Sequence, residues 1–247
     1  MDFWLTVHIL KLYSNFRRFS KNSLPRICIL CSLHTPEPIP ICSACRLHLP
    51  FNHHPCRRCA LPLPAQAPID SLCGQCQNPM PSFDAVVAPF LYSEPVSNMI
   101  NRFKHQGHLW AGAAITDMLA EQLLAREKPD CIVPIPLHWY RQFNRGFNQA
   151  DWIARRLARQ LDIPVDSALI KRTTATPPQQ GLNRKQRLKN LRHAFQLNKS
   201  FSGSTIAIVD DVITTGSTLS TIATLLKLNG ATKVYGWSLA RTGLEKN

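Results

Sequence analysis

The sequence has no run of about 18 consecutive apolar residues, and this absence excludes a single helix that crosses a bilayer. Acidic residues are scarce: 15 Asp and Glu stand against 29 Lys and Arg among 247 residues, a net charge of +14. That excess predicts a polyanionic partner or substrate, such as nucleic acid, a phosphate ester or an acidic membrane surface. With 45% hydrophobic residues, the chain is not disordered, and its length suits one domain or one with a small appendage.

The chain also lacks the charge order of a secretory signal. Residues 1–27 form an N-terminal extension whose apolar part, Phe3–Leu12, follows Asp2 and precedes Arg17 and Arg18. A signal peptide has its positive charge first and a small-residue cleavage site afterwards. We therefore expect a cytoplasmic protein with no transmembrane segment, whose extension is an amphipathic lead-in. Contact with the inner face of the membrane is the alternative.

Cysteine is concentrated in one part of the chain. Eight of the nine cysteines form four C-x-x-C pairs, and in a reducing compartment such pairs predict tetrahedral zinc sites. We expect a double zinc ribbon over residues 28–80 that binds one or two Zn²⁺. The spacing fits two sites in series, and an interleaved pairing stays open. The expected ligands are Cys28, Cys31, Cys42 and Cys45, then Cys56, Cys59, Cys73 and Cys76.

These sites are expected to be structural, because four protein ligands leave no open position on the ion. Metal binding would supply much of the folding free energy of a segment with so few apolar runs. Thioredoxin-like redox chemistry is disfavoured, because no βαβ pattern surrounds any of the pairs. The nearby histidines are interpreted as surface residues, and Cys131 as a small buried hydrophobe.

The remaining part, residues 82–242, alternates strand-like and helix-like apolar patterns. This alternation predicts an α/β fold with a parallel sheet and flanking helices. Strands are expected at 84–92, 131–136, 204–210 and 234–239, with a short extended piece at 169–172. Helices are expected at 96–103, 109–128, 150–161 and 218–228.

Two adjacent acids end the most informative strand. The apolar stretch 206–209 leads directly into Asp210 and Asp211. Ligands of open α/β sheets bind at the carboxyl ends of the strands, so the pair is expected at a binding edge. Neighbouring carboxylates repel one another unless donors or a cation offset the charge. Ionised carboxylates only accept hydrogen bonds, which makes the diol of a ribose a natural partner.

Small hydroxylic residues follow the acids and lead into a helix. They surround one glycine in the order Thr214, Thr215, Gly216, Ser217 and Thr218. Such a loop presents backbone N–H groups and the positive end of a helix to a phosphate. Acids for a sugar beside amides for a phosphate predict a site for a phosphorylated ribose.

The string 206–218 resembles, without a gap, the phosphoribosyl-pyrophosphate motif of type I phosphoribosyltransferases. The head with four C-x-x-C pairs, joined to this domain and to the segment Arg145-Gly146-Phe147-Asn148-Gln149, resembles the ComF competence-protein family over most of residues 28–242. The resemblance implies a type I phosphoribosyltransferase-like parallel sheet with flanking helices, preceded by a small zinc-ribbon head with four-cysteine sites. It also implies a role in natural competence or in DNA uptake and utilisation.

The resemblance implies a role for each site residue. Asp210 and Asp211 would bind the ribose hydroxyls of phosphoribosyl pyrophosphate with Mg²⁺ nearby, and residues 214–218 would hold the 5′-phosphate. Pro136 and Leu137 match the pyrophosphate loop. Arg141 and Arg145 lie just beyond this loop and would meet the diphosphate, or else form a solvated face. The stretch 173–192, which contains no acidic residue, matches the mobile hood loop.

Two functions from different classes follow. The first is a magnesium-dependent phosphoribosyltransferase acting on a nitrogenous acceptor. Thr214 stands where purine-salvage members carry an aspartate, which disfavours a hypoxanthine-like acceptor. The second is a non-catalytic competence factor that binds single-stranded DNA in the same basic pocket, with the DNA-uptake machinery as its partner. Aromatic residues among the arginines could stack on bases, although ordinary packing explains them too: Trp139, Tyr140, Phe143 and Phe147.

Overall fold

The computed structural model describes residues 26–137, 146–173 and 194–243. The chain forms two compact units that divide between His48 and Leu49. The first unit holds the cysteines from Cys28 to Cys45 and the short helix α2 (Ser43–Leu47). The second unit holds the sheet and also the remaining cysteine pairs, from Cys56 to Cys76. The two halves of the cysteine-rich segment therefore belong to different units.

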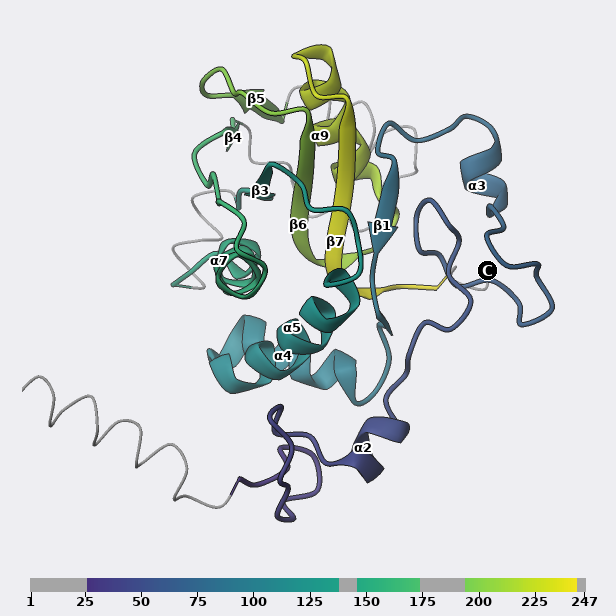
Figure 1. Cartoon of the computed structure of the whole chain (residues 1–247), viewed down its shortest axis with the longest axis vertical. Coiled ribbons are helices and arrows are strands. Elements are labelled where there is room, and N and C mark those ends of the chain that lie inside the picture. The colour runs from purple at the N-terminus through teal and green to yellow at the C-terminus, as the bar shows by residue number, and fades with distance from the viewer. Residues whose placement is uncertain (1–25, 138–145, 174–193, 244–247) are drawn as a thin grey trace, which may run out of the picture. The chain divides into compact units, whose positions relative to one another are not determined.

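The second unit is built on a parallel sheet. Its strands are β1 (Ala85–Val87), β2 (Phe90–Leu91), β3 (Cys131–Pro134), β6 (Thr205–Ile213) and β7 (Lys233–Arg241). The order is β1-β7-β6-β3, with β2 also paired to β7, and all of these pairings are parallel (Figure 1). The first five residues of β6 are all buried, as expected for a strand covered on both faces.

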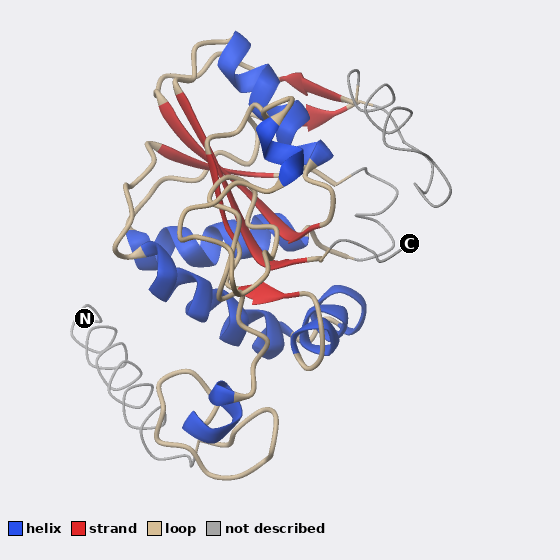
Figure 2. Cartoon of the chain, turned by 90° about the vertical axis from the view of Figure 1, so that its right-hand side faces the viewer, coloured by secondary structure: helices blue, strands red, loops and turns tan. Residues whose placement is uncertain are grey.

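Helices lie on both sides of the sheet (Figure 2). They are α4 (Val96–Gln106), α5 (Leu109–Leu123), α7 (Gln149–Leu161) and α9 (Ser217–Leu228), with the short α3 (Gly74–Gln77) near the cysteines. Helix α7 packs on β3 and β6, α5 on β1 and β7, and α9 on β7. A separate antiparallel pair, β4 (Ile170–Arg172) with β5 (Phe195–Leu197), lies against α9.

The packing of α9 depends on a glycine in the sheet. A Cβ atom at Gly236 would overlap the side chain of Leu219, so the bare backbone lets α9 approach β7 closely. Alternation along β6 turns Ile206 and Ile208 toward this face, where they join the same buried cluster as Leu219 and Ile222. The first turn of α9 is thereby held against β6 and β7.

The α/β fold class is confirmed, and several element boundaries differ from the sequence prediction by two residues or more. The stretch 84–92 forms two strands, since Pro89 has no N–H to donate to a ladder. Helix α5 stops at Leu123, five residues short of the predicted end. Strand β6 continues to Ile213, because Val212 and Ile213 still pair with β7. The two acids consequently lie within the strand.

Within the described ranges, no helix combines the length and the apolar character needed to cross a membrane.

Candidate functional site

The acid pair lies in the carboxyl half of β6. Successive strand residues point to opposite faces, so Asp210 faces the α9 side and Asp211 the α5 and α7 side. The Asp211 N–H donates to Asp210 Oδ1 at 2.9 Å. Lys104 Nζ, from α4, lies 2.9 Å from Asp211 Oδ1, and the two side chains are only 15% and 14% exposed. Sequence reasoning missed Lys104, whose position on an amphipathic helix gave no signal of a site.

Burial and charge act together on Asp210. Burial, and after it the repulsion from Asp211, raise the pKa of Asp210 to about 7, while Lys104 and Arg172 oppose the rise. A carboxyl whose pKa lies so far above the usual value of about 4 is stabilised in its charged form by any added cation or hydrogen-bond donor. The site is thus electrostatically prepared for a ligand that brings hydroxyl donors or a metal ion.

The hydroxyl-rich loop wraps the amino end of α9. Gly216 is the N-cap residue with φ 74°, a left-handed conformation that side chains disfavour. The Ser217 N–H donates to Thr215 Oγ1 at 3.3 Å, and the two hydroxyls lie 2.6 Å apart. The first N–H groups of a helix have no acceptor within it, so this end presents donors and positive potential. Thr214 and Thr215 are exposed, and Thr218 is half-buried.

A second loop meets the same edge of the sheet. The Ile135 N–H donates to the Val209 carbonyl at 2.9 Å, so the half-buried Pro136 and Leu137 follow β3 beside the acid pair. Asn148 secures this loop: its amide donates to the Ile135 carbonyl at 3.1 Å, and its Oδ1 accepts the Ala150 N–H at 3.0 Å as the cap of α7.

Some predicted residues cannot be placed. Arg141 and Arg145 lie outside the described residues, and so does most of the stretch 173–192. Its amino-terminal flank is described, and there the Arg172 guanidinium stacks over the Phe195 ring at 5.4 Å from the centroid. The positive charge of Arg172 lowers the pKa of Asp210, which places this arginine among the charges that act on the site.

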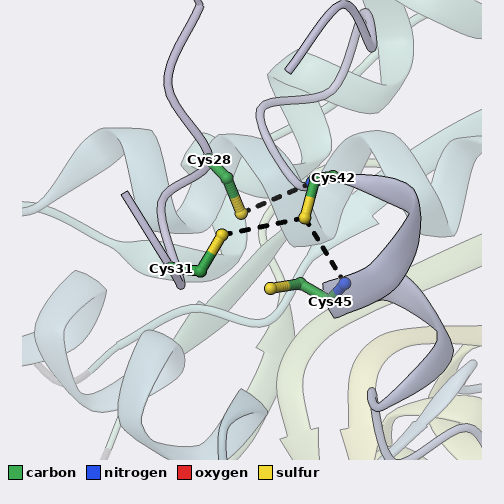
Figure 3. Close-up of side chains that lie close together, drawn as sticks. All are labelled: Cys28, Cys31, Cys42 and Cys45. Carbon is green, nitrogen blue, oxygen red and sulfur yellow. Dashed lines mark hydrogen bonds between the residues drawn. The ribbon is translucent and has the colours of Figure 1, made fainter. Parts of the chain in front are cut away.

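The cysteines form two groups in series, so the interleaved pairing is excluded. Within each group all the sulfurs lie within 4.8 Å of one another, and among the described residues both groups contain cysteine alone. The four side chains of the first group turn toward one another in Figure 3. The Sγ atoms of Cys31 and Cys42 are 3.8 Å apart, and those of Cys59 and Cys73 are 3.6 Å apart. In a tetrahedral zinc site with four thiolates, neighbouring sulfurs lie about 3.8 Å apart, because each Zn–S bond is about 2.3 Å long.

The thiol electrostatics also fit zinc. Burial acts to raise the pKa of Cys56. Backbone N–H groups that donate hydrogen bonds to its sulfur, including the N–H of Cys73 at 3.2 Å, outweigh burial and lower this pKa to about 7. Burial and neighbouring thiolates raise the pKa of Cys59 to about 11. The group therefore has a sulfur ready to ionise and others that need a cation before they can, which is the character of a structural zinc site. Cys131 belongs to neither group and is half-buried, and burial raises the pKa of its thiol.

Comparison with known proteins defines the class. A family model described as a phosphoribosyl transferase domain matches residues 111–240, and one described as a double zinc ribbon domain matches residues 21–77. The protein thus has a type I phosphoribosyltransferase fold with a zinc-ribbon head. A purine phosphoribosyltransferase from Pyrococcus horikoshii shows 20% identity and a TM-score of 0.35, and the match covers 56% of this chain and 92% of that one.

Curated relatives narrow the class to a family. Competence protein F of Haemophilus influenzae is 41% identical over 178 residues, which are 68% of this chain and 78% of the relative. DNA utilization protein YhgH of Escherichia coli is 38% identical over 176 residues, which are 69% and 78% of the two chains. The chain belongs to the ComF family.

Proposed function

We propose that this protein binds phosphoribosyl pyrophosphate with Mg²⁺ and transfers the phosphoribosyl group to a nitrogenous acceptor, in the service of DNA uptake or utilisation in the cytoplasm. One observation carries the proposal: an acid pair in β6 runs within three residues into a hydroxyl-rich loop at the amino end of α9. Sugar-binding acceptors and phosphate-binding donors are consecutive there. The names of the relatives, competence protein and DNA utilization protein, support the cellular role.

Each part of the ligand has a chemical counterpart in the described residues. The carboxylates of Asp210 and Asp211 accept hydrogen bonds from the two ribose hydroxyls. The amides and hydroxyls of residues 215–218 hold the 5′-phosphate at the positive end of α9. The loop at Pro136 and Leu137, next to β6, receives the diphosphate. Arg141 and Arg145 follow that loop in sequence and supply positive charge to the diphosphate.

The reaction is a displacement at the anomeric carbon of the ribose. The bond from this carbon to the diphosphate oxygen breaks with both electrons leaving on oxygen, and a bond from the acceptor nitrogen forms. Positive charge develops on the sugar, where the carboxylates of Asp210 and Asp211 stabilise it. The acceptor nitrogen gives up its proton to the departing diphosphate or to water, because the hydroxyl of Thr214 is not a base at neutral pH.

Magnesium fits the donor set. Carboxylate and phosphate oxygens are the ligands that Mg²⁺ prefers, and the adjacent carboxyls of Asp210 and Asp211 supply such oxygens beside the proposed position of the diphosphate. When bound, the ion neutralises the diphosphate and makes it a better leaving group.

The double change Asp210→Asn and Asp211→Asn tests the proposal. Calorimetric titration of phosphoribosyl pyrophosphate with Mg²⁺ is expected to show a loss of affinity of at least 100-fold, about 3 kcal/mol, because an amide is a weaker acceptor for hydroxyl donors. Asp162→Asn is the matched control, since Asp162 is exposed at the far end of α7 and an asparagine suits its left-handed backbone. Unchanged affinity in the folded double variant would refute the site. Pyrophosphate release with a panel of nitrogenous bases then identifies the acceptor.

Binding of single-stranded DNA is the second candidate function. Trp110 is 42% exposed at the start of α5 and stacks on His108 with ring centroids 5.3 Å apart. The preceding helix, α4, carries the exposed basic residues Arg102 and His105. Exposed aromatic rings among positive charges are what single strands bind. Phe147 supports packing instead, since its ring lies edge-to-face on buried Phe103 at 5.4 Å. The other three aromatic residues, Trp139, Tyr140 and Phe143, lie outside the described residues.

Binding at two salt concentrations separates this candidate from the first. A DNA-binding surface predicts affinity for an oligonucleotide that falls steeply between about 50 and 200 mM salt and weakens in Trp110→Ala. If the protein turns over phosphoribosyl pyrophosphate but binds the oligonucleotide weakly or independently of salt, only the transferase function is supported.

A further inference from the structure

Arg241, the last residue of β7, lies at the junction of the second cysteine group and the phosphate loop. It is 2% exposed, and is among the largest fully buried side chains of the described chain. Its Nε donates to the Cys59 carbonyl at 3.1 Å. Its Nη1 donates to the carbonyls of Ile213, at 3.1 Å, and of Thr214. One guanidinium therefore connects a zinc-ligand residue to Ile213, the last residue of β6, and to Thr214, the first residue of the hydroxyl-rich loop 214–218, called the phosphate loop below.

A buried guanidinium needs compensation for its charge and acceptors at fixed angles. Burial lowers the pKa of Arg241, while the thiolate of Cys59 and those of Cys73 and Cys76 favour the charged form. A zinc ion with four thiolates carries net negative charge, so this arginine also compensates the charge of that group. The planar fork of donors fixes the angles between its acceptors, which a flexible ammonium does not do. Moving Cys59 would therefore move the carbonyls of Ile213 and Thr214.

The same two parts enclose a pocket of about 140 Å³. On the cysteine side it is lined by Cys59, Gln75 and Cys76, and on the other side by Thr215, Gly216 and Ser217. Phe83 lies between them, 3.8 Å from where a Cβ of Gly216 would be. The second cysteine group thus forms one wall of this pocket and the phosphate loop forms the other, while Arg241 donates to a carbonyl on each side, those of Cys59 and Thr214.

We propose that Arg241 is a positioning residue through which the second cysteine group holds the phosphate loop in its binding conformation. The expected effect of Arg241 on the affinity for phosphoribosyl pyrophosphate rests on the function proposed above. Its expected effect on the conformation of the loop does not depend on that function. Arg58, on the same zinc ribbon, provides a contrast. Its Nη2 donates to the Pro81 carbonyl at 3.0 Å and lies 3.8 Å from Asp84 Oδ1, at the entry to β1, so it anchors the ribbon without touching the loop.

The test compares Arg241→Lys with Arg58→Lys in the full chain with zinc bound. The first change keeps the charge, but an ammonium cannot reach all the carbonyls at once. Hydrogen exchange of the amides of residues 214–218 is expected to quicken at least tenfold in Arg241→Lys, with the amides of α7 unchanged. Arg58→Lys is expected to leave the loop amides as they are in the natural protein. Arg241→Gln serves as the second variant if Arg241→Lys does not fold, since it keeps a short donor without the charge.

Ligand binding provides the second readout. The Kd for phosphoribosyl pyrophosphate with Mg²⁺ is expected to rise at least tenfold in Arg241→Lys and less than threefold in Arg58→Lys, with equal zinc content in both. If the natural protein does not bind this ligand, the proposed function fails, and the exchange measurement still decides the role of Arg241. Loop amides that exchange at the natural rate in folded Arg241→Lys would overturn the inference, as would equal effects of the two variants.

Discussion

The two cysteine groups have the same ligands and opposite surroundings. In the first group only Cys28 is buried, and Cys31 is exposed. In the second, all four cysteines are buried and belong to the same apolar cluster as Val86, Ile208 and Leu219. The first group organises a small unit of its own, whereas the second is part of the core beneath the sheet. A repeated metal-binding pattern therefore serves two purposes, and burial is what distinguishes them.

Replacing matched ligands should separate the two groups most strongly. Cys59→Ser is expected to destabilise the second unit by more than about 4 kcal/mol, because it removes a buried zinc ligand from the core of the sheet. Cys31→Ser is expected to leave the unfolding free energy of that unit within about 0.5 kcal/mol of its natural value. Thermal unfolding followed through buried Trp237, together with zinc content, measures both effects. Equal destabilisation of the second unit by the two variants would contradict the distinction.

Asp210 gives the second unit a pH dependence that the first unit does not share. Its raised pKa, about 7, means that the folded protein retains a proton which the unfolded chain releases near pH 4. The carboxyl therefore costs stability increasingly as pH rises from about 4 to 7, and the cost is complete above about pH 7. Asp210→Asn should stabilise the second unit by about 1–4 kcal/mol at pH 8 and by almost nothing at pH 4.

Denaturant unfolding at the two pH values measures this gain. Because the second cysteine group shares a unit with the site, zinc release from that group is expected to slow at pH 8 in Asp210→Asn, and release from the first group to keep its rate. A gain that is the same at pH 4 and pH 8 would show that the carboxyl does not titrate as described.

The smallest expected effect concerns the loop after β3. Asn148→Ala removes both the cap of α7 and the donor to the Ile135 carbonyl, at a cost of about 1–2 kcal/mol. Asn148→Asp is the control, since it keeps the capping oxygen and loses only the donor. Chemical denaturation should rank the natural protein, Asn148→Asp and Asn148→Ala in order of falling stability, with zinc content unchanged in both variants. Loss of zinc would mean that this loop is coupled to the cysteines.

Much of this organisation could be predicted from local sequence. The C-x-x-C spacing indicated both zinc groups, since ligands that lie close in sequence reach the same ion. The apolar run that ends in two acids indicated the strand, and the hydroxyls around Gly216 indicated the helix end. Each of these signals lies within a few residues, where chain geometry alone determines which groups meet.

The contacts between distant segments could not be predicted. Lys104 meets Asp211 only because the packing of α4 on α5 brings the end of α4 to the acid pair, and Lys104 alone looks like a solvated helix residue. Arg241 looks like an ordinary strand end, yet β7 delivers it to carbonyls on two other segments. The burial of the second cysteine group in the unit of the sheet, which begins at Leu49, likewise had no signal in the C-x-x-C pattern of the segment 28–80. Packing, which decides these contacts, has no local pattern.

A crystal structure of the full chain with phosphoribosyl pyrophosphate and Mg²⁺ would decide whether the acid pair and the loop form one binding site. We predict the 5′-phosphate on the amides of residues 215–218, the ribose hydroxyls on Asp210 and Asp211, and Arg241 still bonded to the carbonyls of Cys59 and Ile213. A ligand bound elsewhere, or the phosphate loop engaged after Arg241 has left Cys59, would contradict this arrangement.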